Sequence, residues 1–463
     1  MKTVRVAITG LSGSGKTVFI TAVVHHLLHW QREQMPDFPR KRERYPVRAK
    51  LIPVPAGRRV FPYEENLVLL RKTPPEWPPS TTCASEIHLE MAYRRTKRRE
   101  DNVYEPHGKW QRLRLELVDY PGEWLVDVPL RKMDFPSWSA RVLAESETEE
   151  RQAHACKWRN ELADVRSDTS YDRTRAQRLV TAYKDYLRAC RADPRGLVYL
   201  QPGRLLMPAE LDGRDVLEFC PLPATALTPR PATQPPRLYD VFAQRFDRYR
   251  RTVVQPFFDE YFARAQVQVV LLDLFSILKA GLAAYNDHRR CIEDIIGSLR
   301  YGRASWLTRT VLQPLGWPAS IERTLFVATK ADHASPNQHA NLKHLLHDLV
   351  TTAELHATGR QGDASILTTY VSAMRSTEAV EGVTEVDGRK VTGLRGVILG
   401  QDARGEQSIF PGEVPPAFPE DDWNTRACSF PAFRVKGFPR KHGSAGPHIN
   451  LDTVLGCMLE GEL

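Results

Sequence analysis

Runs of apolar residues recur along the chain, and their spacing predicts one sheet interleaved with helices. Residues 86–93 and 113–118 alternate apolar and polar positions, as half-buried strands do, whereas residues 267–274 are apolar almost throughout, as buried parallel strands are. Further strands are expected at residues 4–8, 324–328 and 366–371. Apolar residues at helical spacing predict helices at residues 18–30, 281–299 and 337–349. This alternation indicates an α/β fold with a mostly parallel central sheet.

Three stretches depart from this pattern. Residues 31–85 are rich in proline and basic groups, so they are expected to form an extended, switch-like loop rather than a long helix. Residues 137–265 predict a mainly helical insertion, and the chain after residue 375 predicts a small β-rich and loop-rich addition that ends in a short helix. The expected units are therefore 1–136 and 266–375 for the two parts of the α/β domain, 137–265 for the insertion and 376–463 for the addition.

The first expected strand leads directly into a glycine-rich loop, Gly10-Leu11-Ser12-Gly13-Ser14-Gly15-Lys16-Thr17, and a helix is expected immediately after it. Strand, G-x-x-x-x-G-K-[ST] and helix in this order are typical of a P-loop. The glycines let backbone N–H groups approach phosphate oxygens, Lys16 adds a positive charge for the β- and γ-phosphates, and Thr17 offers a hydroxyl to Mg²⁺. Lys16 is also expected to act in catalysis. The residues expected to bind the nucleotide here are Gly10, Ser12, Gly13, Ser14, Gly15, Lys16, Thr17 and Val18.

A second motif, Asp119-Tyr120-Pro121-Gly122, follows the strand at 113–118. Asp119 stands at the carboxyl end of a strand, where ligands bind in open α/β sheets, and can hold a Mg²⁺-bound water. Gly122 lets its backbone N–H approach the γ-phosphate. Upstream, a threonine of Ser80-Thr81-Thr82 can reach the same metal, with Thr82 as the candidate. A hydroxyl-rich turn before a strand is the alternative interpretation of this last segment.

The segment Thr329-Lys330-Ala331-Asp332, after the strand at 324–328, predicts that the base is guanine. The carboxylate of Asp332 can accept hydrogen bonds from both N1–H and the exocyclic amine of guanine, a donor pair that adenine lacks. Lys330 can lay its methylene stem over the base while its ammonium braces the P-loop. The later loop Ser372-Ala373-Met374 is expected to direct a backbone N–H at guanine O6. Thr329 completes the set of residues expected to bind GTP or GDP.

Charge and cysteine content narrow the class of protein further. The net charge is +9, but the 65 basic residues are spread among 56 acidic ones, so the sequence makes no strong case for nucleic-acid binding. Basic runs at residues 40–42 and 94–99 are more simply explained as solvated surface. Seven cysteines without a C-x-x-C pair suit a reducing cytosol, and no run reaches the length of about eighteen apolar residues that a transmembrane helix needs. A cytoplasmic protein is therefore expected.

The four motifs GLSGSGKT, DYPGEW, TKAD and SAM stand in the order of a GTPase. The chain resembles the bacterial YcjX-like family of stress-associated P-loop GTPases in these motifs and in three further segments. They are Val128-Pro129-Leu130, Arg300-Tyr301-Gly302-Arg303 and the sequence ATKADH at residues 328–333. The resemblance implies a Ras-like P-loop nucleotide domain that carries the helical insertion and the β-rich addition. It also implies binding of GTP and GDP, induction under stress, and a membrane-protein partner that would hold the protein peripherally at the inner membrane.

Two positions depart from ordinary small GTPases. Thr329 replaces the usual asparagine, which weakens one contact between its loop and the P-loop. Glu123 stands after the glycine of the second motif, where a water-positioning glutamine often stands, and its carboxylate can orient water but repels the γ-phosphate. We therefore expect slow intrinsic hydrolysis that awaits an arginine from Arg300, Arg303 or a partner, because such an arginine is worth about 10³–10⁵ in rate.

The leading interpretation is a guanine-nucleotide switch with weak GTPase activity that acts through a partner protein. One alternative is an ATP-dependent motor or phosphotransferase, which the guanine-type segment at residues 329–332 disfavours. The other is a nucleotide-stabilised scaffold whose working surface is the insertion and whose hydrolysis is dispensable.

Overall fold

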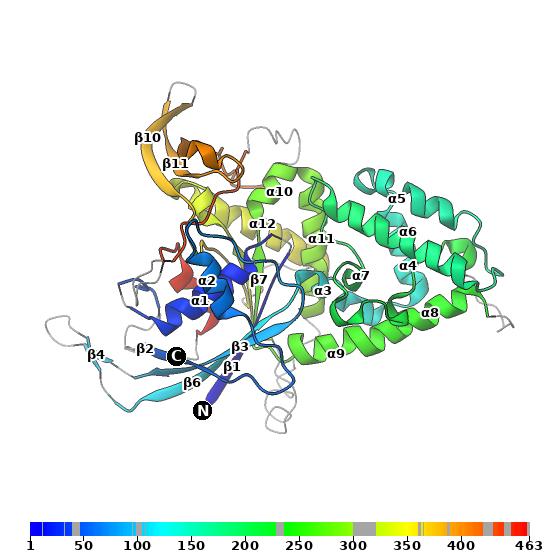
Figure 1. Cartoon of the computed structure of the whole chain (residues 1–463), viewed down its shortest axis with the longest axis horizontal. Helices are drawn as coiled ribbons and strands as arrows, with labels where there is room; N and C mark the ends of the chain where they lie inside the picture. The colour runs from blue at the N-terminus through cyan, green and yellow to red at the C-terminus, as the bar shows by residue number, and fades with distance from the viewer. Residues whose placement is uncertain are drawn as a thin grey trace.

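A sheet of seven strands forms the centre of the molecule, in the order β2-β3-β6-β1-β7-β8-β9 (Figure 1). A computed structural model describes residues 1–11, 13–31, 33–38, 47–94, 96–98, 104–106, 108–227, 236–299, 321–359, 363, 365–386, 389–419, 429–438 and 446–460. The strands are β1 (Lys2–Gly10), β2 (Val47–Ile52), β3 (Ser85–Tyr93), β6 (Gln111–Asp119), β7 (Val267–Leu272), β8 (Arg323–Ala328) and β9 (Ile366–Tyr370). Strand β3 runs antiparallel to β2 and β6, and the other neighbouring pairs are parallel. The predicted α/β fold with a mostly parallel sheet is confirmed.

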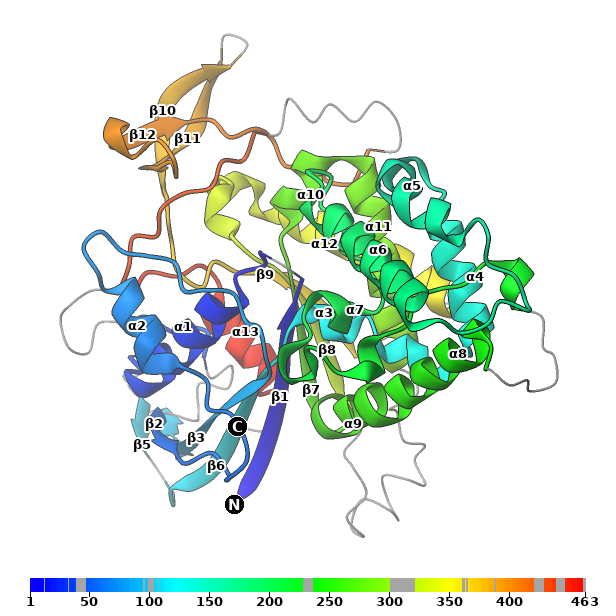
Figure 2. The same ribbon diagram turned by 45° about the vertical axis from the view of Figure 1, so that its right-hand side comes forward.

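Helices cover both faces of this sheet (Figures 1 and 2). On one face, α1 (Lys16–Leu28) and α13 (Leu451–Met458) share a hydrophobic core with the strands, and α2 (Tyr63–Leu70) lies beside α1. On the other face the core is shared with α10 (Leu274–Ala280), α11 (Leu282–Leu299) and α12 (His339–Thr358). Alternation within β1 explains the two cores, because Val4, Val6 and Ile8 point into the first and Ala7 into the second.

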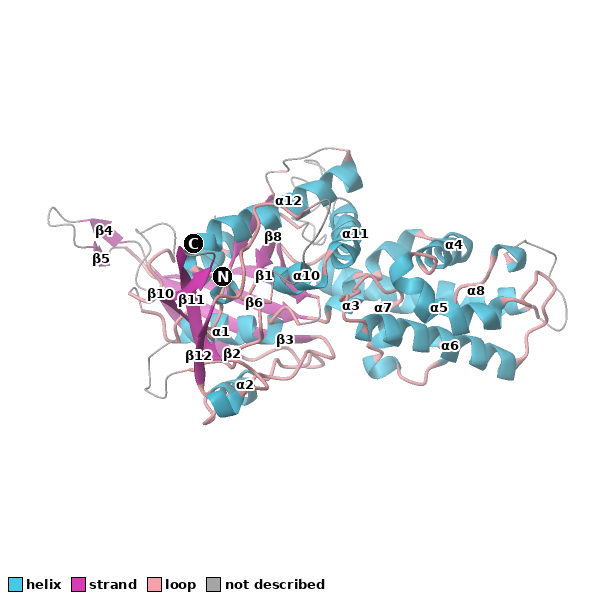
Figure 3. Cartoon of the chain, turned by 90° about the horizontal axis from the view of Figure 1, so that it is seen from above, coloured by secondary structure: helices cyan, strands magenta, loops and turns pink. Residues whose placement is uncertain are grey.

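The predicted helical insertion lies between β6 and β7 and has a core of its own. Its helices are α4 (Phe135–Glu145), α5 (Glu149–Leu162), α6 (Arg173–Ala192), α7 (Gly203–Leu206), α8 (Leu238–Tyr249) and α9 (Gln255–Phe257). Aromatic rings fill that core: Trp138 stacks on Phe246 with ring centroids 4.9 Å apart, and Trp158 stacks on Tyr186 at 5.2 Å. Figure 3 shows this helical body extending away from the sheet, with α3 (Gly122–Leu125), α7 and α11 where the two parts meet.

The chain after β9 forms the predicted β-rich addition. Strands β10 (Glu378–Val386), β11 (Arg389–Val397) and β12 (Glu406–Ile409) make an antiparallel sheet that projects from the body of the molecule (Figure 2). A separate hairpin pairs β4 (Thr96–Arg98) with β5 (Tyr104–Pro106). None of the described helices combines the length and the apolarity that a membrane span needs. The domain boundaries given above stay predictions.

The proline-rich stretch at 31–85 is more ordered than the sequence suggested. It contains strand β2, which adds to the sheet edge beside β3, and helix α2, which packs near α1. The described prolines next to these elements bound them instead of interrupting them, since Pro53 directly follows β2 and Pro62 is the N-cap of α2. Residues 71–84, directly before β3, contain neither helix nor strand.

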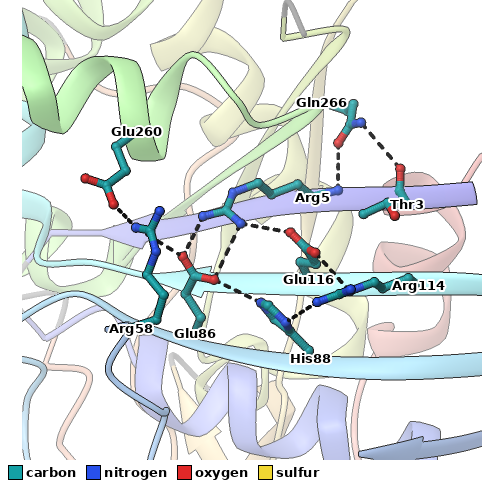
Figure 4. Close-up of polar contacts among 9 residues, drawn as sticks. All are labelled: Thr3, Arg5, Arg58, Glu86, His88, Arg114, Glu116, Glu260 and Gln266. Atoms are coloured by element: carbon teal, nitrogen blue, oxygen red, sulfur yellow. Dashed lines mark hydrogen bonds and ion pairs between the residues drawn. The ribbon is translucent and has the colours of Figure 1, made fainter. Parts of the chain in front are cut away.

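A row of charged side chains crosses the sheet where β1, β6 and β3 lie side by side (Figure 4). Arg5 on β1 pairs with Glu86 on β3 at 2.6 Å and with Glu116 on β6 at 2.8 Å. His88 lies 2.9 Å from Glu86, and both side chains are almost fully buried. Arg58, from the loop after β2, reaches the same carboxylate at 3.7 Å. The row therefore fastens the loop that follows β2 to the middle of the sheet.

Glu86 is the carboxylate on which this row converges. Burial by itself raises the pKa of Glu86, but hydrogen bonds from His88 and Arg5 and the charges of Arg5 and Arg58 outweigh burial and lower the pKa to about 2. A carboxyl group whose pKa is lower in the folded chain stabilises the fold above its unfolded pKa of about 4.3. That stability is lost as the pH falls through this range toward 2.

We predict that Glu86→Gln lowers the free energy of unfolding by about 2–3 kcal/mol at pH 7, because it removes the charge that the buried Arg5 needs. Urea unfolding at a series of pH values should show the gap to wild type narrowing as the pH falls from about 5 to about 2. Glu90→Gln on the same strand is the control, since its two ion pairs are 3.5 Å long and involve exposed partners, and it should cost under about 1 kcal/mol. A gap that stays constant with pH would contradict the role given to Glu86.

Candidate nucleotide site

Loops at the carboxyl ends of the central strands converge on one cavity of about 350 Å³. Strand β1 has β6 on one side and β7 on the other, and such a crossover point is where open α/β sheets bind ligands. Most of the predicted site residues line this cavity. They are Gly10, Gly13, Ser14, Gly15, Lys16, Thr17, Val18, Gly122, Glu123, Thr329, Lys330, Asp332, Ser372, Ala373 and Met374. Ser12, Arg300 and Arg303 lie outside the described residues.

The loop between β1 and α1 has the conformation that its glycines allow. Gly13 and Gly15 have φ angles of 80° and 76°, in the left-handed region that favours glycine. Gly10 is required for a different reason, because a Cβ there would lie 2.2 Å from the Ser14 Oγ atom. Helix α1 begins directly after Gly15, so its free N–H groups and positive dipole end lie at the cavity. These features suit an anion such as a phosphate chain.

Gly122 brings the second motif into contact with this loop. A Cβ added to Gly122 would lie 2.5 Å from the carbonyl oxygen of Gly10, which no side chain can do. The backbone that follows β6 therefore packs directly on the end of β1. This close approach places Glu123, the next residue, at the rim of the same cavity.

A buried ion pair joins the two motifs. The Lys16 Nζ atom lies 2.8 Å from Asp119 Oδ1 and donates a hydrogen bond of 2.9 Å to the carbonyl of Tyr120. Burial raises the pKa of Asp119, and the charge of Lys16 and the hydrogen bond from Thr81 oppose that rise. The two charged groups that the sequence assigned to phosphate and to metal are thus held against each other.

Two threonine hydroxyls, those of Thr17 and Thr81, lie beside this ion pair. Thr81 donates a hydrogen bond of 2.8 Å to Asp119 Oδ2, and its hydroxyl lies 3.3 Å from the hydroxyl of Thr17. Hydroxyl and carboxylate oxygens are ligands that Mg²⁺ prefers, so these residues fit that metal. Thr82, the predicted metal ligand, instead lies with its hydroxyl 3.6 Å from Cys83 Sγ and outside the cavity lining. Spacing alone could not separate the two adjacent threonines.

The same cavity is also lined by Asp332, the predicted base-reading carboxylate. Asp332 Oδ2 accepts hydrogen bonds from both the backbone N–H and the hydroxyl of Ser376, each 2.6 Å long. Thr377 donates a further hydrogen bond to the Asp332 carbonyl. Sequence reasoning missed Ser376, because it lies two residues beyond the loop Ser372-Ala373-Met374 that was expected to complete the site. The position of Asp332 is therefore fixed by the segment that leads into β10.

The Lys330 ammonium, which was expected to brace the P-loop, is paired with Asp273. Its Nζ lies 2.6 Å from Asp273 Oδ2, and its backbone has a φ of 59°. Burial alone would raise the pKa of Asp273, yet the charge and hydrogen bond of Lys330 lower it. Asp273 also caps α10 by accepting a hydrogen bond of 3.2 Å from the Ser276 N–H. Thr329 hydrogen-bonds the Leu272 carbonyl, which keeps it on the strand ends.

Residues from distant parts of the chain close the cavity. Trp77 and the prolines after it line the cavity from the segment before β3, and Leu399 and Phe433 line it from the C-terminal addition. The indole N–H of Trp77 donates a hydrogen bond of 3.2 Å to the Phe433 carbonyl. Arg191, from the end of α6 in the insertion, also lines the cavity, and it lies 2.7 Å from Glu123. No motif marked these residues, because their neighbours in space are far away in the sequence.

Comparison with known proteins gives concordant results over nearly the whole chain. Residues 4–463 match the family model described as the YcjX-like family, DUF463. A protein of Escherichia coli (strain K12) named Ras-like GTPase YcjX is 33% identical over 465 residues, covering 99% of this chain and 96% of the relative. A protein of Shewanella oneidensis with the same name is 30% identical over 484 residues, covering 99% of this chain and 94% of that relative.

We predict that Gly122→Ala destabilises the protein by about 1–3 kcal/mol, because the added methyl group must push the β6 loop off the Gly10 carbonyl. Gly297→Ala is the matched control: a Cβ added to Gly297 in α11 would meet no atom within 4 Å, so alanine there should stabilise by about 0.5–1 kcal/mol. Both values come from chemical denaturation. Equal effects of the two substitutions would refute the close packing at Gly122.

Proposed function

The chain belongs to the YcjX-like family, whose curated relatives are named Ras-like GTPases, and from that premise we propose that it is a slow GTPase and a guanine-nucleotide switch. One observation carries the proposal: the described residues of the phosphate loop and Asp332, which is held by Ser376, line one and the same cavity. A triphosphate laid on the loop would extend its base toward that carboxylate.

Guanine is favoured by the hydrogen-bonding capacity of the base end. One carboxylate oxygen of Asp332 accepts two hydrogen bonds from Ser376. The carboxylate still has lone pairs that can accept hydrogen bonds from N1–H and the exocyclic amine of guanine. Adenine presents an acceptor at N1 and would leave the second oxygen of the buried carboxylate without a donor, which costs binding energy. Ala373 would offer its backbone N–H to O6, and the stem of Lys330 would cover one face of the ring.

At the phosphate end, Thr17, Thr81 and Asp119 would hold Mg²⁺, directly or through water. The ion, when bound, neutralises charge on the β- and γ-phosphate oxygens. Lys16, which is paired with Asp119 in the structure, would instead pair with those phosphate oxygens. The Asp119 carboxylate would then be available to the metal. Glu123 would orient the attacking water, and its negative charge would repel the γ-phosphate and slow hydrolysis unless a cation neutralises it.

The biological setting forms part of the same proposal. The family resemblance suggests a role in a stress response and a membrane-protein partner, which would recruit a cytoplasmic switch to the inner membrane. The elements placed to signal nucleotide state are the segment before β3 and the segment after β6, since both line the cavity through Thr81 and Glu123.

We predict that the wild-type protein binds GDP at least about 100-fold more tightly than ADP in calorimetric titration, because only guanine satisfies Asp332. Asp332→Asn should reverse the preference from guanine to xanthine, since the amide N–H can donate to the xanthine 2-carbonyl. Retained binding of xanthosine diphosphate would confirm that the variant is folded. Equal affinity of the wild type for GDP and ADP would favour the alternative of an ATP-dependent enzyme.

A second prediction separates the adjacent threonines. Thr81→Ala should raise the Mg²⁺ concentration needed to retain a fluorescent GTP analogue by about 10-fold or more, since one oxygen donor beside Asp119 is lost. Thr82→Ala, which removes a hydroxyl outside the cavity lining, should leave that concentration unchanged. The reverse order of effects would restore Thr82 as the metal ligand.

A further inference from the structure

The cavity contains one cation that the proposed site does not use. Three lysine or arginine side chains are found among its described lining residues, namely Lys16, Lys330 and Arg191. Lys16 is paired with Asp119 and Lys330 with Asp273. Arg191 donates to the Glu123 carboxylate at 2.7 Å, and its side chain keeps 32% of its exposure. It belongs to the helical insertion, while the other two cations belong to the α/β domain.

The main chain that carries Arg191 is firmly placed. Helix α6 ends at Ala192, and its last turns are anchored by the buried side chains of Tyr186, Leu187 and Cys190. Beyond the helix, Asp193 accepts hydrogen bonds from Arg195 and His154, which fix the turn. The arginine therefore projects from a rigid support, and only its own side chain needs to move.

The insertion also packs tightly on the segment that carries Glu123. A Cβ on Gly203 in α7 would lie 1.8 Å from the Glu123 carbonyl oxygen, so the two backbones are in direct contact. Trp124 donates a hydrogen bond of 3.1 Å to the Met207 carbonyl, and the Arg204 guanidinium lies 3.2 Å from the centre of the Trp124 ring. The distance between the end of α6 and the cavity is thus fixed by contacts on both sides.

We infer that Arg191 is a catalytic arginine that the insertion supplies to the γ-phosphate within the same chain. This inference rests on the proposed GTPase function and replaces Arg300 and Arg303 as the source of that charge. In the reaction a water oxygen forms a bond to the γ-phosphorus while the bond from phosphorus to the bridging oxygen breaks. The electron pair stays on the β-phosphate of GDP, and the water proton leaves with inorganic phosphate. Arg191 stabilises the charge on the transferring group.

The pairing with Glu123 explains how a carboxylate is tolerated beside the γ-phosphate. A guanidinium has five N–H donors in a planar fork, so Arg191 can hold Glu123 through one edge and a phosphate oxygen through another. Neutralised in this way, Glu123 can accept a hydrogen bond from the attacking water without repelling the phosphate. A lysine would offer a single point charge and could not bridge the two groups in this fixed geometry.

The test compares Arg191→Ala and Arg191→Lys with Arg188→Ala, a control one turn earlier on α6 whose side chain is 61% exposed. Single-turnover hydrolysis of bound GTP should fall by about 10³-fold in both Arg191 variants and stay at the wild-type rate in the control. Affinity for GDP should stay within about threefold of wild type, while tight binding of GDP with aluminium fluoride, which mimics the transferring phosphoryl group, should be lost. Guanidinium ion in solution should partly restore hydrolysis by Arg191→Ala.

Two outcomes would overturn the inference alone. One is an Arg191→Ala protein that hydrolyses GTP and binds the fluoride complex as wild type does. The other is an equal loss of GDP and GDP–fluoride binding, which would make Arg191 a structural residue. A wild-type protein that binds no guanine nucleotide would instead overturn the proposed function, and this inference with it.

Discussion

The contact between Lys16 and Asp119 is the interaction on which the rest of the site depends. Both side chains are almost fully removed from water, so neither charge can persist without the other, and loss of one partner of such a pair costs about 3–5 kcal/mol. The pair ties the end of β1 to the end of β6 and holds Thr81 through the same carboxylate. A phosphate chain that takes Lys16 must leave Asp119 a new cation. In the proposed function, phosphate and metal binding would therefore be coupled by charge balance.

From this pair, two connections lead to the C-terminal addition. Thr81 is joined to Trp77 through two prolines and a serine, a short stiff stretch, and Trp77 is hydrogen-bonded to Phe433. Asp332 is held by Ser376, which lies directly before β10. Both the metal end and the base end of the cavity thus contact the base of the three-stranded sheet. The insertion reaches the third region, around Glu123, through α6 and α7.

Local patterns in the sequence were sufficient to predict the sheet, the insertion, the phosphate loop and the placement of Asp119 and Asp332. These features depend on residues close together in the chain, such as the alternation in β1 and the loop at residues 10–17. Features that depend on tertiary contacts were not predicted. Spacing could not distinguish Thr81 from Thr82, and nothing near Arg191 marked it as facing a cavity. The ordered β2 and α2 were missed because flanking prolines resemble interrupting ones until the partner strand is known.

The packing of α13 has a consequence for how the protein is made. Leu451, Val454 and Leu455 share the core that covers α1, and Asn450 hydrogen-bonds the end of β9 at the Tyr370 carbonyl. The phosphate loop leaves the ribosome long before α13 does, so the helix behind the loop gains its last apolar cover only after residue 451 has emerged. At about 5–20 residues per second, that interval is on the order of 20–90 s. Throughout it, this part of the apolar face of α1 lacks its native cover, and an interrupted chain leaves it uncovered.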